Sequence, residues 1–532
     1  MKTNILSLLA IAGLLTFASC ANDDTASKDN DQEPGTEGLT SFVEEDQATR
    51  TTGEYDGSGL NFYWTEDDRL WVNTGTALAP VLTQDSKNNI NSTLVNNPAN
   101  PSAVKRIDKA KFWFAGTYTA SSYPVRYTGK GNANGDKVTI KAAQSQTVPN
   151  DASHIGEDGD CGVATATKPV GSGKYHFTLD HKAAYVTFMP YTTQSVIASA
   201  TVQKIRVFTG KTSDALAGTF DLADDGTLSN PATTSNSVEL TVPDFSLPNA
   251  FSYTANGATM VVNPGTYNNV SIEYTIHDPV TNLTGTITKT YPSVTFAAGK
   301  NKKVKMDLQV PVYPHNVYYM WDAQQQCWYG HESSQPKPEN PAVPSDNSWP
   351  QSKAADPDRW YSEELGYADP TGTAPAVLPT TSHFQALPNV NELRWYVQDG
   401  NPHWDTELWA TMGHLYAGGM WLKKKSKISS YRADQAPNGI DYTRSTSNAY
   451  YNNNTITQGK PSNLNDYFYL PALGYYHMGR LANVGNYGVY WTSTPAPEPG
   501  APGAYGLYFC SGFVKVLYFS RGFGFRGVWT AQ

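Results

Sequence analysis

The sequence predicts a mainly β fold, with two tandem Greek-key β-sandwiches followed by an α+β domain. From about residue 53 to 311, short apolar or alternating runs are bounded by Gly, Asn, Asp, Pro and Ser, and helical periodicity is nearly absent. The composition then changes, because ten of the thirteen tryptophans lie beyond residue 313. At 532 residues the chain is long enough for several separate cores.

The N-terminus predicts a lipoprotein signal peptide over residues 1–19. A single lysine precedes an apolar run from Ile5 to Phe17, and two small residues then lead directly to Cys20. This pattern resembles a lipobox, which implies acylation of the Cys20 thiol and removal of the preceding peptide. Simple secretion is the alternative, since the apolar run is too short for a helix that spans a membrane.

Residues 20–50 are predicted to be an acidic tether and propeptide. The stretch after Cys20 is polar and acidic and holds no aromatic residue up to Glu37, so it cannot bury enough apolar surface to fold. Its acidic residues resemble the signal that sends lipoproteins of Bacteroidetes to the outer face of the outer membrane. A plain solvated linker is the alternative. The chain is therefore expected to be an outer-membrane lipoprotein precursor.

A single arginine at the end of this tether is a candidate processing site. Arg50 stands in a polar segment before the first strand-like run, Leu60–Thr65, and an exposed arginine in a loop is accessible to proteases. Together with Trp64–Val72, the segment resembles the start of the fimbrillin family of type V pilus subunits. In that family, cleavage after an Arg or Lys exposes a strand acceptor, which implies that Thr51 becomes the mature N-terminus. An ordinary surface arginine is the alternative.

Two sandwiches are expected in tandem. Phe177–Pro190 resembles the fimbrillin pattern Phe-x-Leu-x-His-x-x-Ala that closes the first sandwich, and Ala217–Leu228 resembles an early strand and turn of the second. The resemblance implies fimbrillin-like Greek-key sandwiches at 51–191 and 192–312. His181 lies in the first motif and is expected to be a packed or hydrogen-bonded strand residue.

A third domain is expected at 313–532, and it is the only part of the chain with clear helical patterns. Within Pro388–Val397, Asn389 is a candidate N-cap and Glu392 stands three residues later, which is the arrangement of a capping box. Thr406–Tyr416 predicts a second helix, ended by a pair of glycines.

Three aromatic segments of this domain share motifs with a known family. Tyr467–Tyr476, Gly488–Thr494 and Gly522–Trp529 resemble the Leu-Pro-Ala-x-Gly, Tyr-Trp-Ser-Ser-Thr and Gly-Phe-x-Val-Arg motifs of the Fibrobacter major-paralogous domain family. The resemblance covers about the last third of the chain. It implies a C-type-lectin-like fold for residues 313–532.

Exposed aromatic side chains of this domain are candidates for stacking on sugar rings or for anchoring a protein partner. The candidates are Trp421, Tyr475, Tyr476 and Tyr505. The signatures of calcium-dependent sugar-binding lectins are missing, because Trp491–Thr494 carries hydroxyls where those lectins carry a carboxylate. Neither a bound metal nor a cofactor is therefore expected.

The four cysteines are few for an exported protein, and Cys20 is assigned to the lipid. Cys161 has no nearby partner in its own half of the chain and is expected to be a free thiol. Cys327 and Cys510 both fall in the third domain, where an oxidising compartment allows them to form a disulfide. The spacing alone leaves open whether they pair.

Charge and motifs exclude several classes of function. A net charge of −9 with a pI near 5.6 argues against a nucleic-acid partner. The basic run Lys423–Lys425 is interpreted as the solvated end of a helix. The sequence has no nucleophile elbow, phosphate-binding loop or zinc-protease motif, so it does not predict an enzyme.

The sequence favours a structural and adhesive subunit of a cell-surface fimbrium. It is expected to accept a strand from the next pilin and to present a lectin-like domain to a host or bacterial surface glycan or protein. Because 220 residues follow the second sandwich, the chain has no free tail to donate, which suits the tip. The alternative is an outer-membrane-anchored lipoprotein that binds glycan or protein without polymerising. The fate of residues 20–50 distinguishes the two hypotheses.

Overall fold

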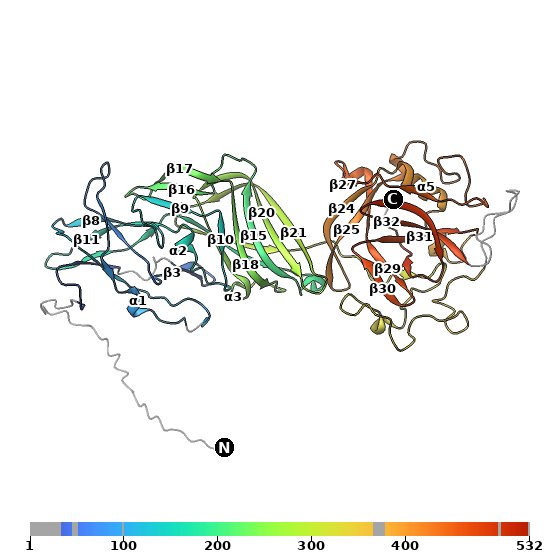
Figure 1. Cartoon of the computed structure of the whole chain (residues 1–532), viewed down its shortest axis with the longest axis horizontal. Coiled ribbons are helices and arrows are strands. Elements are labelled where there is room, and N and C mark those ends of the chain that lie inside the picture. The colour runs from blue at the N-terminus through green and yellow to red at the C-terminus, as the bar shows by residue number, and fades with distance from the viewer. Residues whose placement is uncertain (1–32, 45–51, 98–99, 365–377, 498–501, 530–532) are drawn as a thin grey trace, which may run out of the picture.

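The computed structural model describes residues 33–44, 52–97, 100–364, 378–497 and 502–529. The chain is elongated, with an N-terminal, a middle and a C-terminal region in a row (Figure 1). Strands dominate all three regions and the helices are short. The predicted mainly β class is therefore confirmed.

The N-terminal region is built on one nine-stranded sheet and a hairpin. The sheet has the order β5 (Leu82–Gln84), β4 (Trp71–Asn73), β8 (Ser122–Tyr127), β11 (Gly162–Thr167), β12 (Tyr175–Phe177), β1 (Thr40–Glu44), β7 (Lys111–Phe114) and β6 (Lys87–Asn88), with β13 (Asp180–His181) beside β11. The remaining elements are the hairpin β2 (Thr52–Tyr55) and β3 (Leu60–Tyr63), and the one-turn helix α1 (Ile90–Thr93). Aromatic side chains, including Trp64 and Phe112, fill the core of this region.

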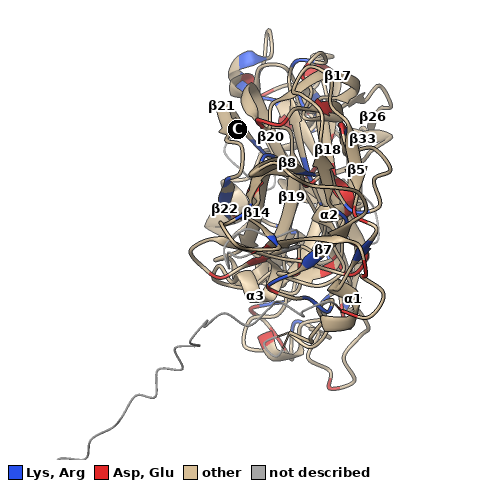
Figure 2. Ribbon diagram, turned by 90° about the vertical axis from the view of Figure 1, so that its left-hand side faces the viewer, with Lys and Arg blue, Asp and Glu red and all other residues tan. Residues whose placement is uncertain are grey.

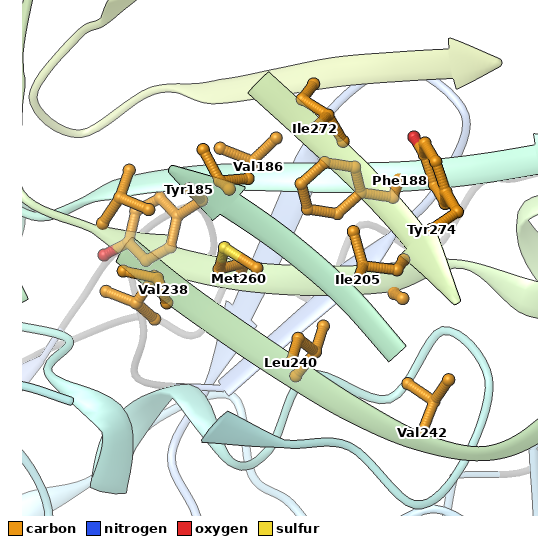
Figure 3. Packing of buried hydrophobic residues seen from close by; sticks show 14 of the residues in the cluster. Tyr185, Val186, Phe188, Ile205, Val238, Leu240, Val242, Met260, Ile272 and Tyr274 are labelled. Carbon is orange, nitrogen blue, oxygen red and sulfur yellow. The ribbon is translucent and has the colours of Figure 1, made fainter. Parts of the chain in front are cut away.

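The middle region contains three sheets around a larger core. The five-stranded sheet has the order β10 (Ala143–Ser145), β18 (Ser237–Ser246), β15 (Thr201–Thr209), β20 (Gly265–Asp278) and β21 (Leu283–Phe296). The two three-stranded sheets are β19 (Ala258–Val262), β14 (Ala184–Tyr191) and β22 (Asn301–Asp307), and β17 (Leu228–Ser235), β16 (Ala217–Leu222) and β9 (Lys137–Ile140). The short helices are α2 (Ile155–Asp158), α3 (Tyr253–Asn256) and η1 (Ser195–Ile197). Residues from several of these sheets, such as Phe188, Ile205 and Met260, meet in one apolar core (Figure 3).

The sheets cross the boundary that was expected between residues 191 and 192. Strands β9, β10 and β14 precede residue 192, yet they pair with β16, β18 and β22, which follow it. An alternating pattern specifies that a segment is a strand and which face is buried, but it does not name the distant strand with which the segment pairs. The N-terminal and middle regions are therefore interleaved in sequence.

The C-terminal region combines an eight-stranded and a four-stranded sheet with one longer helix. The larger sheet has the order β23 (Tyr318–Tyr319), β34 (Phe525–Arg526), β31 (Gly488–Pro495), β32 (Gly503–Cys510), β33 (Phe513–Ser520) and β26 (Tyr451–Asn453), with β29 (Leu473–His477) beside β31 and β30 (Arg480–Val484) beside β29. The smaller one has the order β27 (Thr457–Gln458), β24 (His403–Thr411), β25 (His414–Lys423) and β28 (Tyr467–Pro471). The helices are α4 (Ser382–Gln385), α5 (Val390–Asp399), η2 (Glu332–Ser334), η3 (Lys425–Lys427) and η4 (Leu464–Asp466).

Helix α5 begins with the predicted capping box. The backbone N–H of Glu392 donates to the Asn389 side chain at 3.0 Å, and the N–H of Asn389 donates to a Glu392 carboxylate oxygen at 2.8 Å. Val390, Leu393 and Val397 are fully buried on the helix and pack in the core of this region. The capping-box prediction is confirmed.

The prediction of a second helix at Thr406–Tyr416 is wrong. The segment forms most of β24 and the start of β25, joined by a two-residue turn at Met412 and Gly413. Both turn residues have positive φ, at 55° and 90°, and φ > 0 at both central residues is what a type I′ hairpin turn requires. Consequently Lys423 ends β25 and Lys425 begins the η3 turn, so the interpretation of this basic run as a helix end is also wrong.

The middle and C-terminal regions meet at a polar contact beside a shared apolar core. The carboxylate of Asp278 accepts from the backbone N–H of Leu415 at 2.9 Å and lies 3.1 Å from Nδ1 of His414. The hydroxyl of Thr281 donates to the carbonyl of Leu415 at 3.0 Å. Side chains of β24 and β25 extend the core of the middle region across this contact.

Candidate functional site

Strand β1 lies inside the N-terminal sheet, between β12 and β7. It pairs in parallel with β12, with Phe42 opposite Tyr175, and antiparallel with β7, with Thr40 opposite Phe114. The ladder continues at Glu44, whose N–H donates to the carbonyl of Ala110 at 3.2 Å. Residues 40–44 were expected to belong to an unfolded tether, so that part of the 20–50 prediction is wrong.

Phe42 holds β1 in the core. Its side chain is fully buried and stacks on the ring of Tyr175, with centroids 4.6 Å apart and planes 10° apart. Phe114 and Tyr118 contact it edge to face, at 4.9 and 5.4 Å. Burial raises the pKa of Tyr118 and of Tyr175, in keeping with the apolar surroundings. One phenylalanine therefore fills an aromatic pocket between two strands.

Because β1 lies inside the sheet, the pairing of its two neighbouring strands depends on the five residues Thr40–Glu44. Without β1, the facing N–H and C=O groups of β7 and β12 would lose their partners, and the aromatic pocket would be exposed. A strand from another chain that carries a large apolar side chain at the position of Phe42 satisfies the same requirements. We call this place, bounded by β7, β12 and the pocket of Phe42, the strand slot.

The predicted processing and lipidation residues lie outside the described residues. Cys20 precedes residue 33, where the description begins, and Arg50 with Thr51 falls between β1 and β2. Acylation of Cys20 and cleavage after Arg50 remain predictions. In the sequence, Arg50 comes shortly after β1, the strand that fills the slot.

Cys327 and Cys510 do not form the disulfide that an oxidising compartment would allow. Both are free, as is Cys161, in agreement with the prediction for the latter. Cys327 is fully buried in the core near Trp328, whereas Cys510 ends β32 at a partly exposed hairpin. Burial raises the pKa of the Cys327 thiol to about 12, so this group is protonated at neutral pH.

The four aromatic residues predicted to contact a ligand separate into two groups. Tyr476 and Tyr505 are fully buried, so the proposed ligand contact is wrong for both. The hydroxyl of Tyr476 donates to the carbonyl of Pro336 at 2.7 Å. Trp421 is partly buried, and its indole N–H donates to Asp405 at 3.0 Å. Tyr475 is partly exposed and lines a cleft.

This cleft has a volume of about 540 Å³ and lies at the meeting of the middle and C-terminal regions. We call it the junction cleft. The turn between β20 and β21 borders it with Val280 and Thr281, and the hairpin of β29 and β30 supplies much of the remaining wall. A volume of this size falls within the range of about 300–1,000 Å³ that is common for small-molecule sites.

The β29–β30 hairpin places polar and aromatic groups along the junction cleft. Tyr475, His477, Arg480 and Asn483 all line it. The amide of Asn483 donates to the hydroxyl of Tyr475 at 3.2 Å. His477 stacks on Phe523, with ring centroids 4.4 Å apart and planes 10° apart. The two strands join through a second two-residue turn, Met478 and Gly479, again with positive φ at both positions.

The sheet beside the hairpin carries a chain of partly exposed aromatic rings. Tyr508 on β32 contacts Phe513 and Phe519 on β33, with centroids 5.1 and 6.0 Å apart. Phe519 in turn lies 6.5 Å from Phe523, which contacts Tyr475 at 6.0 Å. Among these contacting aromatic rings, Tyr475 is the one that the sequence analysis named as a candidate ligand contact. Sequence reasoning had no clear signal for Tyr508 and Phe519, because β32 and β33 are apolar at almost every position and no alternation marks one face.

His181 is a packed strand residue, as predicted, but it has an acidic partner that the sequence spacing did not reveal. Its Nδ1 lies 2.8 Å from a carboxylate oxygen of Asp160, and the hydroxyl of Tyr185 donates to the same oxygen. The ring of His181 stacks on Phe62 at 3.9 Å. All these side chains are buried, and the network crosslinks the N-terminal and middle regions.

Among the described residues, no group of three or more His, Cys, Asp and Glu side chains has the arrangement of a metal site. Within the same part of the chain, every helix is too short or too polar to cross a membrane.

No family model and no curated protein matches the chain. Solved structures similar to it include a protein provisionally named a cell adhesion protein, from Bacteroides ovatus, with 14% identity and a TM-score of 0.28 over 51% of this chain and 93% of that one. A fimbrial assembly protein from Parabacteroides distasonis has 12% identity and a TM-score of 0.25 over 50% and 90%. A fimbrial protein from Bacteroides ovatus has 12% identity and a TM-score of 0.22 over 54% and 52%. TM-scores this far below 0.5 do not extend the roles of these proteins to the present chain.

Proposed function

We propose that the chain is a subunit of a cell-surface pilus that exchanges β1 for a strand of the neighbouring subunit. The observation that carries the proposal is the place of β1 in the middle of the N-terminal sheet, directly before the segment that contains Arg50. Cleavage after Arg50 would leave β1 without a covalent link to the rest of the sheet. Its departure would then open the strand slot.

The incoming strand must replace two kinds of interaction. Ladder hydrogen bonds to β7 and β12 contribute about 0.5–1.5 kcal/mol each. Burial of a large apolar side chain in the pocket formed by Phe114, Tyr118 and Tyr175 adds about 1.5–3 kcal/mol. The donor strand is thus expected to carry an aromatic or large aliphatic residue at the position of Phe42.

The path of the chain after β22 favours a terminal position in the pilus. The N–H of Leu308 donates to the carbonyl of Tyr191 at 2.7 Å, and Val312 then bridges to Ala410 of β24. Tyr313 donates from its N–H to the carbonyl of the same Ala410 at 2.9 Å. Because the segment that leaves the middle region is bound to the C-terminal region, it is not available as a donor strand. A subunit that accepts a strand but does not give this segment fits the tip.

The remaining parts of the chain complete this proposal. Acylation of Cys20 would hold the precursor in the outer membrane until cleavage after Arg50 releases the folded regions to the fimbrium. The C-terminal region would then face outward as an adhesin for a glycan or protein on a host or bacterial surface. The junction cleft is the site in this region best suited to such a ligand.

The N-terminal residue of the protein in sheared surface material tests the assembly step. The wild type is expected to start at Thr51, and Arg50→Ala is expected to remain in the membrane fraction with its lipidated Cys20. Arg444→Ala removes an exposed arginine from the C-terminal region and serves as the matched control. A wild-type protein that keeps Cys20 in the membrane and never appears as the Thr51 form would overturn the proposal in favour of a non-polymerising lipoprotein.

A strand-replacement assay tests the slot itself. Protein cleaved after Arg50 in vitro should bind a synthetic peptide that covers residues 36–46, as measured by a rise in its unfolding temperature. The same peptide with Phe42→Ala should bind at least tenfold more weakly, because it leaves the aromatic pocket empty. Equal binding of both peptides would show that the pocket does not select the strand.

A further inference from the structure

We propose that the junction cleft binds an acidic sugar, with the carboxylate of the sugar on Arg480 and its ring against Tyr475. The inference deepens the adhesin part of the proposed function and rests on it for its biological setting. It does not depend on strand exchange, because the cleft is lined by residues of the middle and C-terminal regions, whereas the strand slot belongs to the N-terminal sheet.

The charges of the cleft favour an anion. Arg480 is exposed and lines the cleft, and no Asp or Glu side chain is among the described lining residues. Within the described part of the chain, no carboxylate lies within ion-pair distance of its guanidinium; the nearby Glu339 lies 3.3 Å from His414 instead. Arg480 therefore gives the cleft a local positive charge, although the whole chain has a net charge of −9. The planar guanidinium binds a carboxylate through two parallel hydrogen bonds.

The neighbours of Arg480 favour a sugar over a bare anion. Tyr475 lines the cleft with a partly exposed ring, and Asn483 places its amide beside the Tyr475 hydroxyl. His477 lies opposite Arg480 in the hairpin register, with its ring stacked on Phe523. Aromatic faces next to polar side chains suit a pyranose, which has an apolar face of C–H groups and a rim of hydroxyls.

The hairpin that carries these groups is held rigidly. Tyr476, adjacent to Tyr475 but on the opposite face of the strand, is fully buried and receives a hydrogen bond from Gln335 at 3.0 Å. At the turn, a Cβ added to Gly479 would lie 3.1 Å from the Cβ of Trp349. The glycine therefore allows the turn to sit close against that tryptophan. A fixed backbone beneath these side chains reduces the conformational entropy that is lost when a ligand binds.

Met478 lies at the tip of the same hairpin. It adopts a φ of 48°, which is rare for a residue other than Gly, Asn or Asp, and its side chain is 69% exposed. Positive φ at both turn residues is what a type I′ hairpin turn requires, as at Met412 and Gly413. The tight turn brings the two cleft residues His477 and Arg480 opposite each other.

The geometry of the cleft also distinguishes a sugar from a protein partner. A stable protein interface buries about 1,200–2,000 Å² of total surface over a broad patch. The polar groups of the junction cleft instead line a concave space of about 540 Å³. Polar groups around a space of this size are typical of a site for a small molecule or the end of an oligosaccharide.

Binding of defined sugars to the purified full chain tests the proposal. The probes are 3′-sialyllactose and a glucuronic-acid-terminated trisaccharide as acidic sugars, lactose as the neutral sugar, and inorganic phosphate as the bare anion. Titration calorimetry or ligand-observed NMR should show at least tenfold tighter binding of one or both acidic sugars than of lactose or phosphate. The two acidic probes distinguish a sialic acid from a uronic acid as the preferred residue.

Variants connect the binding to the named groups. Arg480→Gln should remove the preference for the acidic sugar, with a loss of at least tenfold in affinity, while Arg480→Lys should retain part of it. Tyr475→Ala should weaken acidic and neutral sugars alike. Arg444→Gln, an exposed arginine elsewhere in the region, is the matched control and should bind normally. Unchanged unfolding temperatures of the variants verify that they fold.

Three results would overturn the proposal. These are equal binding of lactose and the acidic sugars, full binding by Arg480→Gln, and absence of binding by every sugar at millimolar concentration. Failure of strand exchange would leave all of these titrations unchanged, because they use the free chain. The two proposals can therefore fail separately.

Discussion

Strands β1 and β22 show two different ways to complete a sheet in the same chain. β1 is a five-residue strand with a partner on each side, and Phe42 is fully buried between them. β22 is longer, pairs in parallel with β14 along all seven of its residues, and forms the edge of its described sheet. The short strand is thus the interior one, and the long strand is the exposed one.

The edge at β22 is protected by charge. Lys302, Lys303 and Lys305 are exposed along it. Blue ribbon beside the β22 label in Figure 2 marks basic residues at this edge. They also line an apolar groove of about 190 Å³ between β21 and β22, with Val186 and Ile272 on its floor. Lysines on an edge strand oppose the addition of another strand, because pairing would bury or crowd their charges.

The two strands therefore set different conditions for the addition of a strand from another chain. At β22, the lysines of the edge oppose its addition. At β1, the resident strand must leave first, after which the slot would offer hydrogen-bond partners on both sides and an aromatic pocket, away from the lysines of β22. A protected edge in the middle sheet is therefore compatible with the proposed exchange at the N-terminal sheet.

The largest expected effect is that of Phe42→Ala in the uncleaved chain. Removing a fully buried phenylalanine costs about 3–5 kcal/mol of unfolding free energy. Val304→Ala on β22 is the matched change, and it should cost about 1 kcal/mol because Val304 is only partly buried. Urea denaturation followed by tryptophan fluorescence measures both.

The same two substitutions can also be compared in protein that has been cleaved after Arg50. After cleavage at Arg50 and loss of β1, the Phe42 substitution is no longer part of the protein, whereas the cost of Val304→Ala should persist. If Phe42→Ala and Val304→Ala cost the same in the uncleaved chain, β1 is not held by the pocket of Phe42, and the contrast between the two strands fails.

The sequence predicted features that depend on local patterns. The strand-rich fold, the capping box at Asn389 and the packed state of His181 all follow from neighbouring residues. Phe42 is the only aromatic residue between Cys20 and Arg50, and this was the available signal for β1. The signal was missed because the polar composition of the tether dominated the interpretation.

Features that depend on distant pairing could not be predicted in the same way. The parallel pairing of β1 with β12 joins segments more than one hundred residues apart, and no spacing rule specifies it. The junction cleft likewise needs Thr281 and Arg480 to meet. For the adjacent pair Tyr475 and Tyr476, the alternation of a strand already implies that only one can face the cleft. The structure identifies Tyr475 as that residue.

A second expected effect concerns the joint between the N-terminal and middle regions, at helix α2. His154 precedes α2, and its Nε2 lies 2.8 Å from the carbonyl of Thr259 on β19. The residue is partly exposed, but its ring nitrogens are shielded, and burial lowers the pKa of His154 to about 4. Asp158 lies at the end of α2, where burial raises its pKa to about 6, although Lys141 is 3.1 Å away.

These two groups change stability in opposite directions with pH. The lowered pKa of His154 means that stability is lost as pH falls from about 6.5 toward 4, because the unfolded chain binds the proton more strongly. The raised pKa of Asp158 means that stability is lost as pH rises from about 3.8 toward 6, because the folded chain binds the proton more strongly. In the wild type, these two opposite changes of folding stability with pH should largely cancel between about pH 4 and 6.

Single substitutions should reveal the pH dependence of stability that each of the two groups contributes. His154→Gln leaves the Asp158 effect, so stability should fall by about 2 kcal/mol as pH rises from 4 to 6. Asp158→Asn leaves the His154 effect, so stability should fall by about 2 kcal/mol as pH is lowered from 6.5 to 4. Urea denaturation at a series of pH values measures both, and parallel curves for the two variants would contradict the assignment.

The smallest expected effect on stability comes from substitutions at the β22 edge, and what they are expected to change is the self-association of the protein. The double variant Lys302→Thr and Lys305→Thr should change the unfolding free energy by only about 0.5 kcal/mol, because both side chains are exposed. It removes the charges that oppose pairing and adds residues that favour strands. Sedimentation velocity should therefore show a dimer that grows with protein concentration.

A matched control separates the edge from the net charge. Lys211→Thr and Lys353→Thr remove the same charge from exposed positions outside the strands and should leave the protein in its wild-type association state. Dimers in both double variants would mean that charge alone prevents association. A dimer in the β22 variant alone would show that its lysines prevent pairing at this edge.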